Sequence, residues 1–374
     1  MIEYRISGPA SQERQRIRLM SALRENRFPQ AVLIDGPAGI GKKALAIELA
    51  KALQCSDENV RPCGHCFGCK MASDAGVTDG WVVPMDSKEA HSRDASDVSA
   101  GSTAKTVQDF KQAYIEEIFK NPYRVDIFGA GAEISVDLIR SMTGVFALKG
   151  DRVRVVIVAE ADRMNESASN AFLKTLEEVP PNTYFILTTS SRERMLQTIR
   201  SRCLALHLLP LSDAEVKSIA LQYLDEDFDE DIISDDIVGL AVGSPGKALY
   251  YAEYGKRWCD LAASFINRSL ACEYFELFKE LGEASFEDGA YANRFLEVLS
   301  FLLSDLIRKM SGAKLRLPET SGLVHWGGNL RIDIAALERA LALVQETMER
   351  IASRRTAWMV LLQSLSIKLF EGYK

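Results

Sequence analysis

The chain contains 374 residues, of which 47% are hydrophobic and 26% are charged, and its formal net charge is −7. This length predicts two or three domains, and the composition is that of a globular protein and not of a disordered chain. The negative charge counts against a protein that wraps nucleic acid through a basic surface of its own. The sequence contains no apolar run of roughly 18 residues and no secretory signal pattern at its N-terminus, so we expect a cytoplasmic protein without a membrane span.

The N-terminal half alternates between helical and strand patterns. In chain order we predict a helix at 11–26, a strand at 31–34, a helix at 42–53, a strand at 153–159, a helix at 166–178 and a strand at 184–188. Such alternation predicts an α/β domain with a parallel sheet. After about residue 211 the strand patterns stop and nearly every segment has helical periodicity, so we place domain boundaries near residues 208 and 255.

Two further segments have patterns of their own. Residues 86–132 form an irregular stretch rich in Ser, Asp, Ala and Gly, which indicates an exposed insertion within which 109–119 can form a helix. Near the C-terminus, apolar residues recur at spacings of three and four, at Ile334, Leu337, Leu341, Val344, Met348 and Ile351. This stripe predicts one packed face of a helix and not a cofactor site.

The segment Gly36-Pro-Ala-Gly-Ile-Gly-Lys42 follows a predicted strand and opens a predicted helix, which is the context of a phosphate-binding P-loop. Gly36, Gly39 and Gly41 let backbone amides curl around a phosphate group, and Lys42 adds a positive charge. The next position is normally Ser or Thr, whose hydroxyl binds Mg²⁺, but here it is Lys43. The sequence therefore predicts a P-loop fold in which ATP binding is in doubt.

The aspartate that holds the Mg²⁺ shell at the end of a buried strand is also replaced. In the run VVIVAEADRM its position is taken by Ala159, while Glu160 remains and Asp162 lies two residues further on. Phosphoryl transfer depends on Mg²⁺ to neutralise the developing charge. Because both groups that serve one metal ion are missing, we expect no efficient ATP hydrolysis.

Four of the seven cysteines fall within fifteen residues of one another: Cys55, Cys63, Cys66 and Cys69. Tetrahedral Zn²⁺ takes four such ligands, and the Cys-x2-Cys spacing lets two sulfurs reach one ion. A site closed by four thiolates has no open coordination position, so the predicted zinc is structural. His65 lies inside the cluster and could replace one thiolate, and a chance or redox-active cluster is the alternative. The other cysteines are predicted to be buried small residues: Cys203, Cys259 and Cys272.

Several segments carry a family resemblance. They are the P-loop with its cysteine cluster, 170–178 (NAFLKTLEE) with the following prolines and 185–189 (FILTT), 199–203 (IRSRC) and 243–249 (GSPGKAL). Together they resemble the clamp-loader branch of the AAA+ family, and most closely its delta-prime subunits of bacterial DNA polymerase III. The resemblance covers most of residues 20–250, whereas the C-terminal part matches mainly through 354–365. The degenerate nucleotide motifs favour delta-prime over the similar gamma/tau subunit, which keeps the metal-binding residues.

The resemblance implies roles for parts of the chain. It implies an AAA+ α/β module at residues 1–208 with a zinc module at 55–69, a helical lid at 209–255, and an all-α collar at 256–374 that joins subunits in a ring. Ser201-Arg202-Cys203 is similar to the clamp-loader SRC motif, so Arg202 would reach the γ-phosphate of ATP held by a neighbouring subunit as an arginine finger. The alternative is an ordinary surface arginine. Residues 188–190 lie where active relatives sense the γ-phosphate, and the alternative is that they only cap the strand. Lys247 lies where a second sensor arginine often occurs, and the alternative is a solvated helix residue.

The resulting functional prediction is a subunit that is not catalytic alone and that helps to place a sliding clamp on primed DNA. Its implied partners are the gamma/tau and delta clamp-loader subunits, the sliding clamp, and primer–template DNA within the complex. One alternative is an ATP-hydrolysing, gamma/tau-like motor subunit. A second is a zinc-dependent nucleic-acid-binding module unrelated to replication, which leaves the LKTLEE and SRC segments unexplained.

The negative charge is unevenly distributed along the chain. Eight acidic residues between 225 and 236 contribute −8 with no basic residue among them, so the rest of the chain carries about +1. This acidic segment is predicted to be a solvated loop or helix face. The negative total therefore argues against a lone DNA-wrapping protein, but not against a subunit that meets DNA within a ring.

Overall fold

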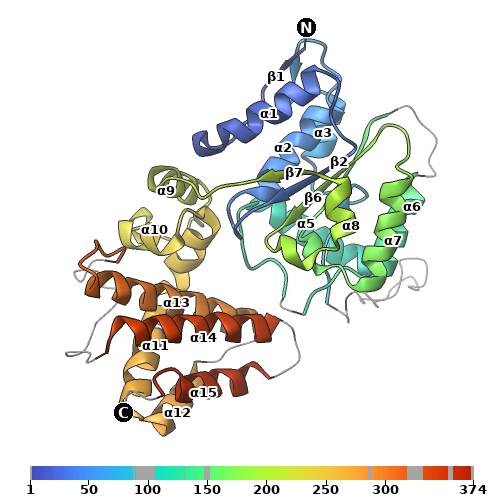
Figure 1. Ribbon diagram of the computed structural model, residues 1–374. Helices are drawn as coiled ribbons and strands as arrows, with labels where there is room; N and C mark the ends of the chain where they lie inside the picture. The colour runs from blue at the N-terminus through green and yellow to red at the C-terminus, as the bar shows by residue number, and fades with distance from the viewer. Residues whose placement is uncertain are drawn as a thin grey trace. The chain divides into compact units, whose positions relative to one another are not determined.

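The computed structural model describes residues 2–86, 89, 106–129, 131–146, 152–284, 289–317, 332–352 and 357–371. By packing, the chain forms two compact units (Figure 1). The first comprises Met1–Tyr223 with Gly243–Lys247, and the second comprises Leu224–Val242 with Ala248–Lys374. The finer division at residues 208 and 255 stays a prediction.

The first unit is built on a five-stranded sheet. Its strands lie in the order β4 (Trp81–Val82), β5 (Arg154–Val158), β6 (Thr183–Thr189), β2 (Ala31–Asp35) and β7 (Leu204–His207). All four pairings are parallel, and Asp35 at the end of β2 pairs with Thr189 at the end of β6. The carboxyl ends of the strands therefore meet at one edge, where the P-loop begins at Gly36.

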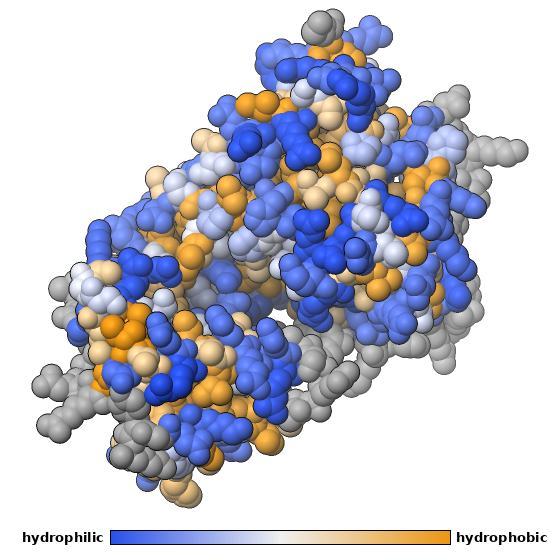
Figure 2. Space-filling model, viewed as in Figure 1, coloured by the Kyte–Doolittle hydropathy of each residue, from blue (hydrophilic) through white to orange (hydrophobic). Residues whose placement is uncertain are grey.

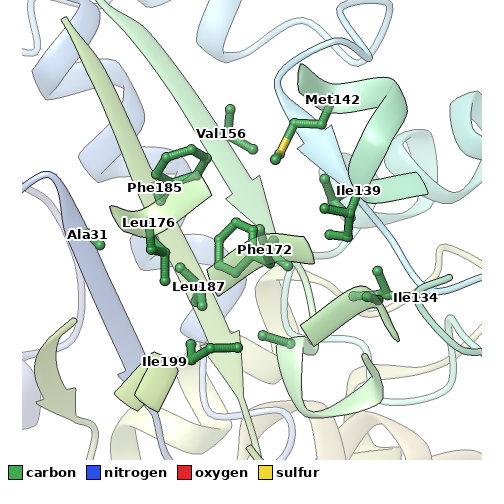
Figure 3. Packing of buried hydrophobic residues seen from close by; sticks show 14 of the residues in the cluster. Ala31, Ile134, Ile139, Met142, Val156, Phe172, Leu176, Phe185, Leu187 and Ile199 are labelled. Carbon is green, nitrogen blue, oxygen red and sulfur yellow. The ribbon is translucent and has the colours of Figure 1, made fainter. Parts of the chain in front are cut away.

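Helices cover the sheet because each strand is apolar on both faces, as expected of a buried parallel sheet. On one face lie α6 (Val136–Phe146), α7 (Glu166–Glu177) and α8 (Gln197–Arg202), which share a core with the strands (Figure 3). Within it, the rings of Phe172 on α7 and Phe185 on β6 meet edge to face with centroids 5.4 Å apart. Against β2, β5 and β6 also packs α2 (Lys42–Gln54), which begins directly after the P-loop.

The remaining elements of this unit lie around the sheet. They are β1 (Glu3–Tyr4), α1 (Glu13–Arg24), β3 (Val60–Arg61), α3 (Phe67–Ala72), α5 (Val107–Lys120) and α9 (Asp213–Gln222). The helix predicted at 109–119 is confirmed as α5, and it is not an exposed element, since Ile115 and Ile118 are fully buried. Residues 87, 88 and 90–105, the most irregular part of the predicted insertion, lie outside the described residues.

The described residues of the second unit form helices joined by irregular connections, and they include no strand. Its elements are α10 (Asp235–Ala241), most of α11 (Pro245–Ala271), α12 (Tyr274–Glu283), α13 (Gly289–Met310), α14 (Ile334–Ala352) and α15 (Trp358–Lys368). The predicted apolar stripe lies on α14, and each of its members is buried or half-buried. The rings of Phe265 and Phe295 pack 5.5 Å apart in the core of this unit. The predicted acidic segment at 225–236 is mostly exposed, as expected.

The predicted architecture is confirmed: an α/β P-loop module with a parallel sheet, followed by helical segments. The predicted strands and helices of the N-terminal half all form, with ends shifted by one or two residues. On the face shown in Figure 2, hydrophilic residues prevail and hydrophobic ones are interspersed among them. Among the described residues, no helix combines the length and the apolar character that crossing a membrane requires.

Candidate functional site

The P-loop joins the end of β2 to the start of α2, as the sequence predicts. Gly39 and Gly41 adopt left-handed backbone angles, with φ of 73° and 101°, which residues with a side chain rarely adopt. Gly41 is the residue directly before α2, so the first amides of that helix face the loop. The backbone therefore has the shape of a phosphate-binding loop.

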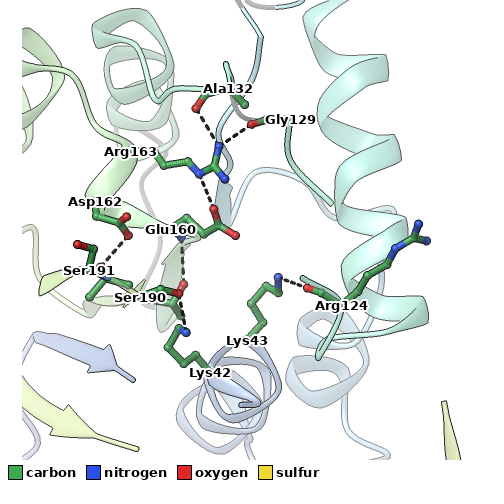
Figure 4. A network of polar contacts seen from close by, with 12 residues as sticks. Lys42, Lys43, Arg124, Gly129, Ala132, Glu160, Asp162, Arg163, Ser190 and Ser191 are labelled. Atoms are coloured by element: carbon green, nitrogen blue, oxygen red, sulfur yellow. Dashed lines mark hydrogen bonds and ion pairs between the residues drawn. The ribbon is translucent and has the colours of Figure 1, made fainter. Parts of the chain in front are cut away.

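Lys42, the lysine of the P-loop motif, is buried and bound by protein oxygen atoms. Its Nζ donates hydrogen bonds to the carbonyl oxygens of Gly36 and Pro37, at 2.8 and 2.7 Å. It also donates to Oγ of Ser190 at 2.9 Å (Figure 4). Burial is the main reason why the pKa of Lys42 falls to about 7, and the neighbouring charge of Lys43 lowers it further. In a working P-loop this amino group would bind a phosphate, but in this chain it is already hydrogen-bonded to three protein oxygen atoms.

Lys43, at the position of the usual Ser or Thr, is also buried. Its Nζ donates to the carbonyl oxygen of Arg124 at 3.0 Å and lies 5.8 Å from the ring centroid of Phe128. Burial lowers the pKa of Lys43 as well. The residue that replaces a metal-binding hydroxyl therefore holds a segment that lies 81 positions further along the chain.

The end of β5 carries the other altered position. Ala159 is fully buried, and Glu160 after it has a left-handed backbone with φ of 48°. The Glu160 amide donates to Oγ1 of Thr188 at 3.1 Å, and its carboxylate pairs with Nε of Arg163 at 2.5 Å. Both polar groups of Glu160 are therefore used inside the protein.

The residues at the end of β6 also serve internal contacts. Oγ1 of Thr189 donates to the Asp162 carboxylate at 2.7 Å, and burial raises the pKa of that carboxyl group. Ser190 accepts from Lys42, as described above. Lys247 lies at the start of α11, where its backbone amide donates to Oγ of Ser244. Whether these residues also sense a nucleotide stays a prediction.

Two cavities of different size lie beside the P-loop. The larger, of about 310 Å³, is lined by Gly41 and Tyr123 together with other residues such as Arg16. The cavity lined by Gly41, Lys42, Lys43, Tyr123 and Glu160 among others has a volume of about 30 Å³. A single water molecule occupies about that share of the liquid volume, so a triphosphate does not fit in this cavity.

The four clustered cysteines come together between the end of α2 and the start of α3. Cys55 directly follows α2, Cys66 caps the N-terminus of α3, and Cys69 lies on α3. All four sulfurs lie within 4.8 Å of one another. The helices approach closely here because residue 68 is glycine: a methyl group at Gly68 would lie only 1.9 Å from the Gln54 carbonyl oxygen.

The spacing of the sulfurs fits a tetrahedral metal ion. Sγ of Cys55 lies 3.7 Å from that of Cys66, and Sγ of Cys63 lies 4.0 Å from that of Cys69. Four sulfurs bound to Zn²⁺ at 2.3 Å would lie about 3.8 Å apart. Backbone amides of Cys63, Cys66 and Cys69 donate to cysteine sulfurs at 3.4 to 3.5 Å, which stabilises thiolates. The cluster can therefore hold a metal ion through four thiolates.

A ring nitrogen of His65 lies within 4.8 Å of the Cys63 sulfur, so the alternative in which His65 replaces a thiolate stays open. His65 is exposed, and its Nδ1 lies 2.9 Å from the carbonyl oxygen of Cys63. Burial raises the pKa of both Cys203 and Cys259 to about 12, in line with packing roles. The prediction of burial is wrong for Cys272, which is exposed in the short connection between α11 and α12 with a left-handed φ of 61°.

Arg202, the predicted arginine finger, is the last residue of α8. Its guanidinium donates to the Thr198 carbonyl oxygen at 3.0 Å and to the Glu177 carboxylate at 2.9 Å. The side chain is 38% exposed. The guanidinium is therefore accessible at the surface of the first unit and is held there by a carboxylate at the end of α7.

Sequence reasoning missed Tyr123 and Arg163 in the surroundings of the P-loop, and Glu177 beside Arg202. Their partners lie at least 25 positions away in the chain, at Gly41, Gly129 and Arg202. No local spacing links such pairs, so a single sequence carries no signal for them. Only the run ADRM, with a basic residue three positions after Glu160, hinted at the Glu160–Arg163 pair.

Comparisons with known proteins agree with these features. The delta' subunit of DNA polymerase III from Haemophilus influenzae is 31% identical over 175 residues, which cover 46% of this chain and 40% of that protein. The Escherichia coli delta' subunit is 29% identical over 249 residues, covering 64% and 59%. The tau/gamma subunit from Haemophilus influenzae is 28% identical over 199 residues, covering 53% and 23%. The matched region thus spans less than two thirds of each relative's length.

A family model described as "DNA polymerase III, delta subunit" matches residues 11–212. This range contains the P-loop, the cysteine cluster and Arg202, and it makes up more than half of the chain. Together with the delta' relatives, this match shows that the chain belongs to the DNA polymerase III delta-subunit family, in agreement with its resemblance to delta-prime subunits.

Proposed function

We propose that the chain is a delta-prime-like subunit of a DNA polymerase III clamp loader that does not turn over ATP itself. The observation that carries this proposal is the state of the P-loop, where Lys43 and Ala159 occupy the two positions that serve Mg²⁺. Without these groups, the metal that neutralises charge in phosphoryl transfer has no side chain to hold it at either position. The subunit would act through its partners, the gamma/tau and delta subunits, on the sliding clamp and primed DNA.

Arg202 is proposed as the group that this subunit contributes to a neighbour's ATP site. A guanidinium can stabilise the charge on a transferring phosphoryl group from across a subunit interface. The position of Arg202 at the exposed end of α8 supports this role. Its ion pair with Glu177 is weak enough to exchange, because surface pairs are worth only about 0–1 kcal/mol.

A reconstituted loader tests this role. Replacing Arg202 by Ala should lower DNA-stimulated ATP turnover at the affected site by at least about tenfold, since arginine fingers contribute factors of about 10³ or more. Arg140→Ala is the matched control, because Arg140 is an exposed arginine of the same unit that also pairs with a carboxylate. If ATP turnover and clamp loading are unchanged in the Arg202→Ala loader, Arg202 is not an arginine finger.

We further propose that the cysteine cluster binds one structural Zn²⁺ through Cys55, Cys63, Cys66 and Cys69. The distances between the sulfurs and the closed four-thiolate ligand set support zinc. Such an ion would tie the end of α2 to α3 and would supply no catalytic position.

The competing function is a gamma/tau-like motor, and the similarity to tau/gamma subunits is the observation that favours it. Equilibrium binding of labelled ATP to the isolated chain separates the two. A delta-prime-like subunit with a degenerate site shows no Mg²⁺-dependent tight binding and no steady hydrolysis, whereas a motor shows both.

A further inference from the structure

The inserted segment at 121–129, which follows α5, lies directly on the P-loop. A methyl group added at Gly41 would lie 2.7 Å from Cε1 of the Tyr123 ring, and one at Gly39 would lie 2.7 Å from Cγ1 of Val125. The two P-loop glycines with left-handed backbone are thus each in contact with a side chain of the insertion.

Two basic side chains hold the segment in this place. At one end, Lys43 donates to the carbonyl oxygen of Arg124. At the other end, the Arg163 guanidinium donates to the carbonyl oxygens of Gly129 at 2.6 Å and Ala132 at 3.2 Å (Figure 4). The same guanidinium pairs with Glu160. Lys43, at a metal-binding position of an ATPase, therefore binds the insertion directly. Arg163, the ion-pair partner of Glu160, binds its other end.

The start of α11 completes the enclosure. The Gly246 amide donates to the Gly39 carbonyl oxygen at 3.1 Å, and Oγ of Ser244 donates to the carbonyl oxygen of Ala38 at 2.8 Å. A methyl group at Gly246 would lie 1.9 Å from the Tyr123 carbonyl oxygen, so the insertion is pressed between this glycine and the P-loop. Contacts from two sides reduce the cavity between Lys42, Lys43 and Glu160 to about 30 Å³.

We propose that the segment 121–129 is a built-in occupant of the P-loop, anchored by Lys43 and Arg163, which excludes the phosphate groups of nucleotides. This inference rests on the proposed degenerate ATP site and gives the insertion a function within it. The occupant role differs from the loss of metal ligands. Loss of the ligands weakens only Mg²⁺-dependent binding, whereas an occupied P-loop also excludes phosphate groups that bind without a metal.

The test uses the isolated full-length chain, with ATP and tripolyphosphate as probes in the presence of a chelator. Wild-type chain should bind neither probe up to about 1 mM by calorimetry. Tyr123→Ala removes the ring from Gly41 and should tighten binding of both probes by at least about tenfold. Hydrogen exchange of the amides at 36–43 should accelerate in the same variant. Arg163→Gln, which releases the other end of the segment, should give the same two changes if Tyr123→Ala does not fold.

Tyr184→Ala is the matched control, because it truncates a half-buried tyrosine on β6 that packs against Phe28 and not against the P-loop. Variants that fold but show neither faster exchange at 36–43 nor probe binding would overturn the occupant role and leave the degenerate site in place. Tight Mg²⁺-ATP binding by wild-type chain would overturn both. The Arg202 experiment in the assembled loader is independent of either result.

Discussion

Lys42 and Lys43 are adjacent in the sequence, yet their side chains bind different parts of the protein. Lys42 is held by the P-loop itself and by Ser190, whereas Lys43 is held by the insertion at Arg124. The sequence identified Lys43 only as a missing metal ligand, because its acceptor is a backbone carbonyl far along the chain. Cys55, Cys63, Cys66 and Cys69 were grouped correctly, since ligand spacing is a local property that a sequence records.

The buried ammonium of Lys42 should make stability depend on pH. Its pKa is about 7 in the folded chain against 10.5 ordinarily, so the unfolded chain binds more protons between these pH values. The contribution of this residue to stability therefore increases from about pH 7 to 10.5. Urea denaturation should show a steeper rise with pH for wild type than for Lys42→Met, by up to about 1.4 kcal/mol per pH unit.

Lys279→Met provides the control for this titration, because Lys279 is 70% exposed. It should leave the pH slope of the free energy of unfolding unchanged. Equal slopes for wild type and Lys42→Met would show that Lys42 is fully charged throughout this range.

At the scale of secondary structure, the sheet and its covering helices follow from hydrophobic pattern. The β-branched run at 154–158 and the period of 166–177 predicted β5 and α7, since both elements are long and strongly patterned. By contrast, β4 has two residues and β7 has four, too few for a pattern to stand out. The helix α6 was missed beside a Gly- and Ser-rich stretch, and its place is set by packing of Ile139 and Met142 against the sheet.

The core between α7 and the sheet should dominate the stability of the first unit. Phe172 is fully buried there and packs against Phe185. Phe172→Ala should lower the free energy of unfolding by about 3–5 kcal/mol, the range for removing a buried aromatic ring. Phe275→Ala is the matched control, because Phe275 is 79% exposed, and it should change stability by less than about 0.5 kcal/mol. A loss below about 1 kcal/mol at Phe172 would show that this core is loosely packed.

At the scale of the whole chain, the two units have different means of stabilisation. The first carries the cysteine cluster, whereas the described part of the second is held by helix packing around residues such as Phe265 and Phe295. The sequence indicated the change from mixed to helical structure near residue 211. It could not show that Gly243–Lys247 returns to the first unit, because that return depends on contacts with Ala38 and Gly39.

Metal removal should therefore act on one unit. Elemental analysis should find about one zinc per chain, and Cys66→Ser should lose most of it because one of four ligands is removed. A strong chelator should raise hydrogen exchange at 55–69 and leave α13 unchanged. Cys272→Ser is the control, since this exposed cysteine lies outside the cluster, and it should keep its zinc. A zinc-free chain with unchanged exchange at 55–69 would contradict a structural metal.

The hydrogen bond from Lys43 to the Arg124 carbonyl also has an evolutionary consequence. A single substitution of Lys43 by Thr would supply a metal-binding hydroxyl but would leave the Arg124 carbonyl oxygen without this part-buried donor, at a cost of about 0.5–1.5 kcal/mol. Under the proposed occupant role of the insertion, this substitution alone should bring no nucleotide binding in return. Placing a hydroxyl at residue 43 without loss of stability therefore requires a second change that supplies the Arg124 carbonyl oxygen with another donor. Through this hydrogen bond, the insertion links the identity of residue 43 to the stability of the first unit.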